Sequence, residues 1–220
     1  MVIAAFYVMG SDVRAETAEF EAAEALDQRS SIEHADRRLT ISNKGASAPC
    51  IGVQGDTTHV LWVDGEEGAK KLAWKRSNDS LSTYTADRTI TPFFHSISNI
   101  EIVLGSSFSV AVLFQGQKSP LDGTSVYFLY MDDSDEWSNC LALSAGSGPS
   151  AASDGSAVYL LMNALFDGVE RTSLASIALV DGEVNASFLA ALPIAAVDAD
   201  LSFRDGALDV ALVEDRKSVV

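Results

Sequence analysis

Hydrophobic and polar positions repeat along the chain in blocks of about fifty residues. In each block, a turn containing glycine leads into a short run of apolar residues. One valine of each run marks the period, with steps of 50, 48 and 52 residues between Val60, Val110, Val158 and Val210. A near-continuous apolar run of this length is typical of a β-strand covered on both faces. The period therefore indicates a repeat protein in which each block is one structural unit.

Further strands are predicted around each apolar run. A preceding strand meets the run through a tight turn built on Gly with Asp or Ser, at residues 50–53, 100–104, 150–152 and 199–203. A third strand follows a polar or glycine-bearing loop, at residues 71–76, 125–131 and 174–180. A polar stretch and a fourth strand complete the unit. Because repeated units of four antiparallel strands are typical of propeller blades, we predict an all-β, β-propeller-like array of about four four-stranded antiparallel blades.

The start of the chain differs from the repeats that follow. Residues 15–28 are rich in Ala and Glu and contain no helix breaker, so we predict one short N-terminal helix there. Residues 3–9 and 39–42 predict strands. No basic region precedes the apolar start, which favours a first strand over a cleaved leader peptide. No run approaches the roughly 18 apolar residues of a membrane span, so we predict no membrane insertion.

The fourth repeat is incomplete at the end of the chain. We interpret residues 1–220 as a single domain, with an N-terminal segment at 1–44 and four repeats at 45–220. A propeller closes its ring by pairing strands from its two ends. The N-terminal strands either complete the last blade, or the array is incomplete and lacks further blades. The sequence leaves both alternatives open.

Charge and cysteine usage narrow the classes of partner. The chain has 31 acidic and 15 basic residues, a formal net charge of −16. This charge repels nucleic-acid phosphates and anionic lipids, so we predict no nucleic-acid partner, while a cation, a basic protein or a neutral glycan is compatible with it. Acidity of this kind also simply keeps a protein surface soluble. Cys50 and Cys140 lie at non-equivalent positions of different repeats, which favours two buried thiols over a disulfide.

One turn of the first repeat resembles a known motif. After the third predicted strand, the sequence has a serine, an aspartate, a threonine and an aromatic residue at the spacing of an Asp-box, namely Ser77, Asp79, Thr83 and Tyr84. The Asp-box, Ser-x-Asp-x-Gly-x-Thr-Trp, belongs to the sialidase-like (BNR-repeat) β-propeller superfamily. Here Leu81 replaces its glycine and Tyr84 replaces its tryptophan. The turn therefore resembles a degenerate Asp-box.

The next two repeats keep parts of this motif. The second keeps Asp132 and Trp137, and the third keeps Asp181. The steps from Asp79 to Asp132 and on to Asp181 are 53 and 49 residues, in agreement with the strand period. The resemblance implies a structural role, in which the carboxylate accepts backbone N–H bonds in the turn and the aromatic ring packs into the blade.

The catalytic residues that this resemblance implies are missing. Sialidases of this fold use an arginine triad, a Tyr/Glu nucleophilic pair and an acid–base Asp, with the first arginine in a Phe/Tyr-Arg-Ile-Pro segment that this sequence lacks. The three histidines share no ligand spacing. The acidic residues 132–136 could chelate calcium, but acidic surface turns of this kind are common. We therefore predict no catalytic, cofactor-binding or metal-binding residues.

Aromatic side chains are interpreted differently on predicted strands and in predicted loops. Those at strand positions, Trp62, Trp74, Trp137 and Tyr84, are expected to fill the space between blades rather than to form sugar-stacking platforms. The loop residues Phe93, Phe94 and Phe166 are better candidates for ligand contact. We also expect His59 to face out of its hairpin.

Taken together, these patterns favour a non-catalytic binding module for a protein or glycan partner. An extracellular or periplasmic location is favoured over a cytoplasmic one, and the oligomeric state is left open. The alternative is a diverged glycoside hydrolase of the sialidase-like superfamily.

Overall fold

The protein is described by a computed structural model that covers residues 45–79, 83–105, 107–132, 134–166, 168–192 and 194–214. Within these residues every strand pairing is antiparallel and no helix occurs. The all-β prediction is confirmed. The described part of the chain contains no helix long and apolar enough to cross a membrane. The described strands all belong to the second of the two units into which the chain divides, Ser42–Val220.

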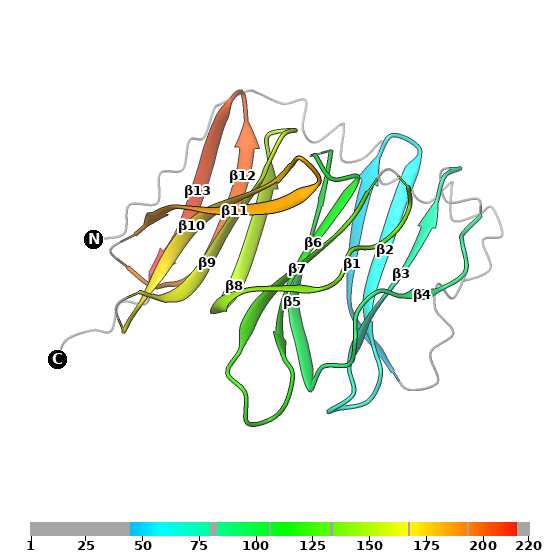
Figure 1. Cartoon of the computed structure of the whole chain (residues 1–220), viewed down its shortest axis with the longest axis horizontal. Helices are drawn as coiled ribbons and strands as arrows, with labels where there is room; N and C mark the ends of the chain where they lie inside the picture. The colour runs from blue at the N-terminus through cyan, green and yellow to red at the C-terminus, as the bar shows by residue number, and fades with distance from the viewer. Residues whose placement is uncertain are drawn as a thin grey trace, which may run out of the picture. The chain divides into compact units, whose positions relative to one another are not determined.

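The strands follow one another as meanders, which Figure 1 shows in chain order. The first repeat has four strands, β1 (Ala46–Gln54), β2 (Thr57–Asp64), β3 (Lys71–Ser77) and β4 (Arg88–Thr89). The second has β5 (Ser96–Leu104), β6 (Val110–Gln117), β7 (Ser125–Met131) and the first half of β8 (Leu141–Ser153). The third has the second half of β8, then β9 (Val158–Phe166), β10 (Val169–Val180) and β11 (Glu183–Ala191). The fourth has β12 (Ala196–Arg204) and β13 (Ala207–Glu214).

Strand β8 belongs to two repeats. Its first half pairs with β7, for example Ala145 with Ser125, and its second half pairs with β9, for example Gly146 with Ala164. This sharing joins β5 to β11 into one seven-stranded sheet. The predicted first and third strands of the repeats lie within observed strands, and the four marker valines lie in β2, β6, β9 and β13.

The described strands do not complete the fourth repeat. Among them β13 pairs with β12 alone, so the fourth repeat has two strands. The expected helix at 15–28 and the expected strands at 3–9 and 39–42 lie outside the described residues.

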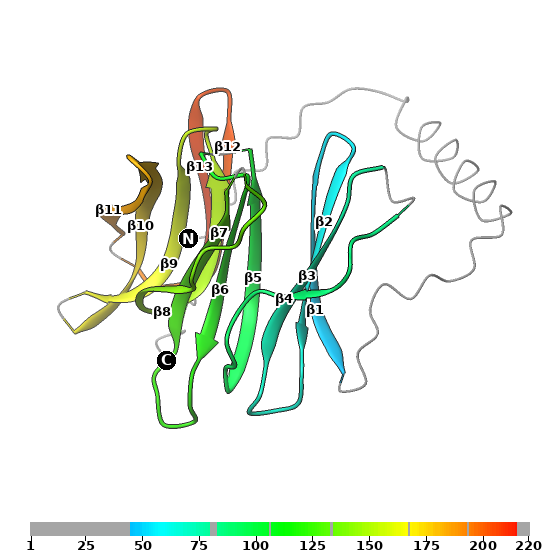
Figure 2. The same cartoon turned by 45° about the vertical axis from the view of Figure 1, so that its right-hand side comes forward.

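Hydrophobic cores lie between successive repeats, which explains the near-continuous apolar runs. Strand β6 shows the principle, because successive side chains of a strand point to opposite faces. Val110 and Val112 pack into the core shared with repeat 1, whereas Ala111 and Leu113 pack into the core shared with repeat 3. All four are fully buried. A strand buried on both faces needs no alternation of apolar and polar residues. Figure 2 shows the successive sheets from a second direction.

Candidate functional site

The Asp79 turn follows β3, at the position expected for the Asp-box-like motif. The Asp79 carboxylate accepts hydrogen bonds from Ser77 Oγ (2.8 Å), from the Thr83 backbone N–H (2.8 Å) and from Thr83 Oγ1 (2.6 Å). Tyr84 is half-buried and packs against the cluster of Val60, Trp62 and Ala73. The described hydrogen bonds of Asp79 thus fasten the turn to itself.

The other motif residues lie on two further turns. The Asp132 carboxylate, after β7, accepts hydrogen bonds from the backbone N–H (2.9 Å) and the hydroxyl of Ser134. Trp137 meets the Trp74 ring edge-on at 5.5 Å between ring centroids. Asp181 has a positive φ of 52° in the turn between β10 and β11. The seven motif residues therefore lie at three separate turns, one at the end of the third strand of each of repeats 1 to 3, with Ser77 as the last residue of β3.

The remaining aromatic candidates divide between core and surface. Trp62 and Trp74 are both buried. Trp74 lies in the core shared by repeats 1 and 2, as expected, whereas Trp62 packs with Val60, Ala73 and Tyr84 within repeat 1. Phe93 is 68% exposed, in agreement with a surface loop position. The expectation for its neighbour Phe94 was wrong, because this side chain is 1% exposed and packs against Phe114 and Tyr127. The side chain of Phe166 lies outside the described residues.

A feature that the sequence analysis did not find is a β-bulge in the first strand of every repeat. The register shifts fall between Ser47 and Cys50 in β1, Ser98 and Glu101 in β5, Ser147 and Ser150 in β8, and Ala196 and Asp198 in β12. Three of the bulges contain a residue with positive φ, namely Ala48, Asn99 and Gly148. A bulge bends its strand and redirects the neighbouring side chains. Because β5 and β12 both contact β8, the last three bulges lie close to one another.

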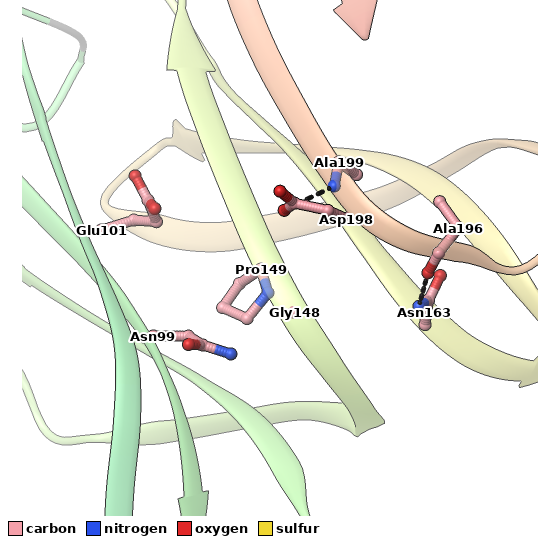
Figure 3. Close-up of a pocket in the computed structure, with 8 residues that line it drawn as sticks. All are labelled: Asn99, Glu101, Gly148, Pro149, Asn163, Ala196, Asp198 and Ala199. Atoms are coloured by element: carbon pink, nitrogen blue, oxygen red, sulfur yellow. Dashed lines mark hydrogen bonds between the residues drawn. The ribbon is translucent and has the colours of Figure 1, made fainter. Parts of the chain in front are cut away.

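A cavity of about 320 Å³ lies at these three bulges. Its lining residues are Asn99 and Glu101 of β5, Gly148 and Pro149 of β8, Asn163 of β9, and Ala196, Asp198 and Ala199 of β12. Figure 3 shows Glu101 and Asp198 on opposite sides of the Gly148–Pro149 segment. Two carboxylates that lie 97 residues apart in the sequence thus line the same cavity.

The polar side chains around the cavity differ in how far they are already engaged. Asn163 donates to the Ala196 carbonyl (2.6 Å) and accepts from Thr172 Oγ1 (2.7 Å), so its amide fastens the wall. Asn99 donates to Gln115 Oε1 at 3.1 Å. The Asp198 carboxylate is exposed and accepts from the Ala199 backbone N–H at 3.0 Å.

Glu101 is the electrostatically perturbed group of the cavity. Burial raises the pKa of its carboxyl, and the nearby negative charge of Asp200 raises it further. No Lys or Arg is among the lining residues. The cavity is therefore acidic. It can accept hydrogen bonds from a ligand, and its Glu101 carboxyl can hold a proton at a higher pH than an ordinary glutamate does.

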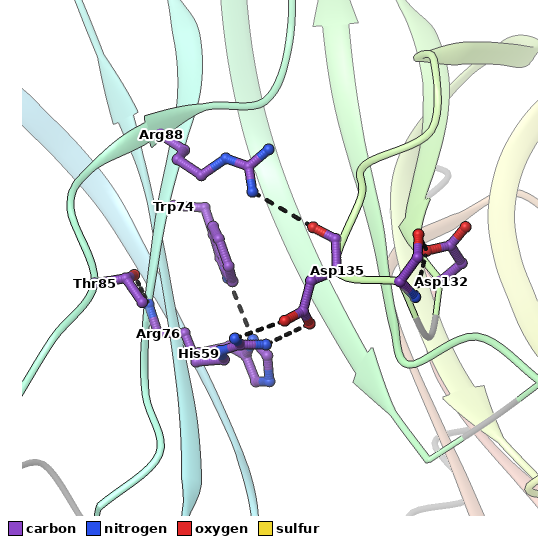
Figure 4. A network of polar contacts seen from close by, with 8 residues as sticks. His59, Trp74, Arg76, Thr85, Arg88, Asp132 and Asp135 are labelled. Carbon is purple, nitrogen blue, oxygen red and sulfur yellow. Dashed lines mark hydrogen bonds and ion pairs between the residues drawn. The ribbon is translucent and has the colours of Figure 1, made fainter.

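A second polar cluster joins repeats 1 and 2 (Figure 4). Arg76 of β3 forms a two-pronged ion pair with Asp135 of the β7–β8 loop, with 2.8 Å between Nη2 and Oδ2. Arg88 approaches Glu136 and the Asp135 carbonyl, each at 3.4 Å. Part of the acidic run considered for calcium is thus engaged by arginines. No group of three His, Cys, Asp or Glu in the described part of the chain is arranged to hold a metal.

His59 lies beneath this cluster, and its expected outward orientation was wrong. The side chain is 4% exposed, and its Nδ1 accepts a hydrogen bond from Trp74 Nε1 at 3.2 Å. Burial lowers the pKa of His59 to about 4, with a further contribution from the positive charge of Arg76. The imidazole is therefore neutral at neutral pH and belongs to the core. Cys50 and Cys140 are half-buried free thiols, and both pack against the core cluster shared by repeats 1 and 2.

Sequence reasoning missed Glu101 and Asp198 because acidic residues are abundant and neither belongs to a motif. The available signal was weak. Asn and Gly tolerate positive φ, so Asn99 and Gly148 at similar places in their repeats could have suggested bulges in the first strands.

Comparisons with known proteins identify no family. No family model matches the chain, and no curated protein matches it. The resemblance to the sialidase-like superfamily therefore stays a prediction. Among solved structures, the chain is similar to an endo-arabinase from Bacteroides thetaiotaomicron VPI-5482, with 12% identity and a TM-score of 0.48. The match covers 79% of this chain and 72% of the endo-arabinase. A likeness at this level supports no conclusion about the activity of the chain.

Proposed function

We propose that the protein is a β-propeller-like binding module that recognises a neutral glycan in the cavity between β5, β8 and β12. The observation that carries this proposal is that two carboxylates, Glu101 and Asp198, line one cavity that has no Lys or Arg among its lining residues. An ionised carboxylate accepts hydrogen bonds and cannot donate them, and sugar hydroxyls supply the matching donors. An anionic ligand would be repelled by the same groups.

The arrangement of repeats supports the propeller part of the proposal. Each of the first three repeats is a four-stranded antiparallel meander, and the first strand of one repeat contacts the first strand of the next, from β1 to β5 to β8 to β12. Innermost strands of blades are neighbours in this way around a propeller axis. In this interpretation the cavity lies on the inner strands, and the Asp79 turn is a structural element away from the ligand.

Binding can be tested on an array of neutral and acidic glycans, followed by calorimetry with the best ligand. We expect neutral glycans alone to bind, and Glu101→Gln and Asp198→Asn each to weaken binding about tenfold, because each variant replaces a charge-assisted hydrogen bond. Glu183→Gln changes an exposed carboxylate of β11 and is the matched control. An affinity that is unchanged in both Glu101→Gln and Asp198→Asn, or a preference for acidic glycans, would contradict the proposal.

The raised pKa of Glu101 favours one second candidate, the hydrolysis of a glycosidic bond. In that reaction Glu101 would protonate the leaving oxygen, and Asp198 would remove a proton from the attacking water. A panel of nitrophenyl glycosides provides the test. Turnover that is lost in Glu101→Gln and kept in Glu183→Gln would support hydrolysis. Binding without turnover in the unaltered protein would exclude hydrolysis of these glycosides and favour the binding module.

A further inference from the structure

A second hollow lies on the other side of repeat 3, away from the inner-strand cavity. It is a groove of about 250 Å³ between the first half of β8 and the sheet formed by β9, β10 and β11. Leu143 contributes one wall, and Leu160, Met162 and Ile177 are among the residues of the other. Leu165, which also lines the groove, is 67% exposed. Exposed apolar surface that continues a hollow marks a place where an apolar ligand can be buried.

The groove has no charged residue among those that line it, although charged residues are common in the rest of the chain. None of its lining residues is Asp, Glu, Lys or Arg, although the chain has 31 acidic and 15 basic residues. A charged ligand would lose its hydration there and gain no ionic partner, which is strongly unfavourable. The groove therefore selects an uncharged ligand.

Three serines line the groove, and they differ in one respect. Ser144 Oγ donates to the Ala145 carbonyl at 3.1 Å, and Ser187 Oγ lies 3.4 Å from the Asn185 amide oxygen. Ser173 is only 3% exposed, and its Oγ has no hydrogen-bond partner among the described residues. Buried hydroxyl groups are nearly always hydrogen-bonded, so an unpaired one calls for a missing partner.

The strand register places this hydroxyl on the groove side of the sheet. Ser173 pairs with Met162 in the β9–β10 ladder, and paired residues share one face of a sheet. Met162 lines the groove. The neighbouring Thr172 points to the opposite face, where it binds Asn163 and the Ala196 N–H. A serine side chain changes its hydroxyl direction by rotation about χ1, so Ser173 can meet a ligand atom without a change in the backbone.

We propose that this groove is a second ligand site, specific for an uncharged and mostly apolar compound with a single hydrogen-bonding atom that pairs with Ser173 Oγ. The site is separate from the inner-strand cavity, and its test is independent of glycan binding.

Indole and indene are a matched pair of probes for this site. The two molecules have the same bicyclic shape, but only indole has an N–H that can donate to Ser173 Oγ. Each is titrated into the full chain labelled with ¹³C in the methionine methyl groups, and the shift of the Met162 methyl reports on the groove. The Met131 methyl, on the side of repeat 2 that faces repeat 1, is an internal control.

We expect indole to shift the Met162 methyl signal in a saturable way and to leave that of Met131 unchanged. The ratio of indole to indene affinity should fall about fivefold in Ser173→Ala, as for the loss of one neutral hydrogen bond. Ala186→Trp adds a large side chain at an exposed position of the groove and should abolish the shift, whereas Ala207→Phe adds an aromatic ring on β13 and should not.

Three results would overturn the proposal. The first is no Met162 shift up to the solubility limit of indole. The second is an equal shift of Met131 and Met162, which indicates non-specific adsorption. The third is an affinity ratio that is the same in the unaltered protein and in Ser173→Ala, which would remove the role of the hydroxyl. Circular dichroism of each variant verifies that the β-fold is intact.

Discussion

At the scale of single residues, burial decides the chemistry of the ionisable side chains. His59 and Glu101 both sit where water is scarce, and in both the neutral form is favoured, so the pKa of the histidine falls and that of the carboxyl rises. Their surroundings differ. Trp74 holds the imidazole in the core, whereas Glu101 lines a cavity that a ligand can reach.

His59 predicts a loss of stability in mild acid. Its pKa is about 4 in the folded protein and 6.5 in an ordinary environment, so the unfolded state binds more protons between these values. The free energy of unfolding should therefore fall as the pH is lowered from about 6.5 to about 4, by about 3 kcal/mol from this group. Urea unfolding at pH 7 and at pH 4.5 measures the change.

The matched variant for this prediction is His59→Gln, whose amide oxygen can still accept from Trp74. Its free energy of unfolding should lack this contribution, and the difference between the two proteins isolates it. The Glu101 carboxyl, whose pKa is raised, contributes with the opposite sign in both proteins and cancels. Identical pH profiles for the two proteins would show that His59 is not buried as described.

At the scale of elements, the repeat pattern identified the strands correctly because a strand is a local property. Apolar runs and glycine turns act over a few residues, and every predicted strand within the described residues is present. The bulges escaped prediction because a bulge depends on the register between two strands, which the sequence of one strand does not state. The double role of β8 escaped for the same reason.

Gly146 is a position in β8 where a side chain should not be tolerated. A Cβ atom there would overlap the Asn163 carbonyl oxygen of β9. We expect Gly146→Ala to lower the free energy of unfolding by about 1–3 kcal/mol, because strand backbone must move to relieve the overlap. Gly123→Ala, in a loop with open space around its Cβ, is the control and should be nearly neutral. Equal stability of the two variants would show that β8 does not pair with β9 in this register.

At the scale of the whole second unit, stacking of repeats creates both the cores and the polar clusters. Repeats 1 and 2 share the core around Trp74 and Phe114, and the Arg76–Asp135 pair bridges the same two repeats near Trp74. Asp135 lies in the β7–β8 loop and has a positive φ of 63°. The pair therefore reports on the docking of one repeat against the next.

A double-mutant cycle with Arg76→Gln and Asp135→Asn tests this docking contact. Asparagine keeps the shape of Asp135 and tolerates its positive φ. We expect a coupling free energy of about 1 kcal/mol at low salt, since the pair is bidentate but partly exposed, and a smaller value at high salt. A coupling of zero, or one insensitive to salt, would show that repeats 1 and 2 do not meet through these side chains.

The sequence by itself determined the all-β class, the order of the strands and the period of the repeats, because these follow from local patterns that neighbouring residues set. It also placed Trp62 and Trp74 in the core, since large apolar side chains on strands covered on both faces have no other place. Only the tertiary structure decided which distant residues share a site. Glu101 and Asp198 line one cavity, and Arg76 forms an ion pair with Asp135, because of strand register and the packing of one repeat on the next. Neither of these is determined by the residues of a single strand.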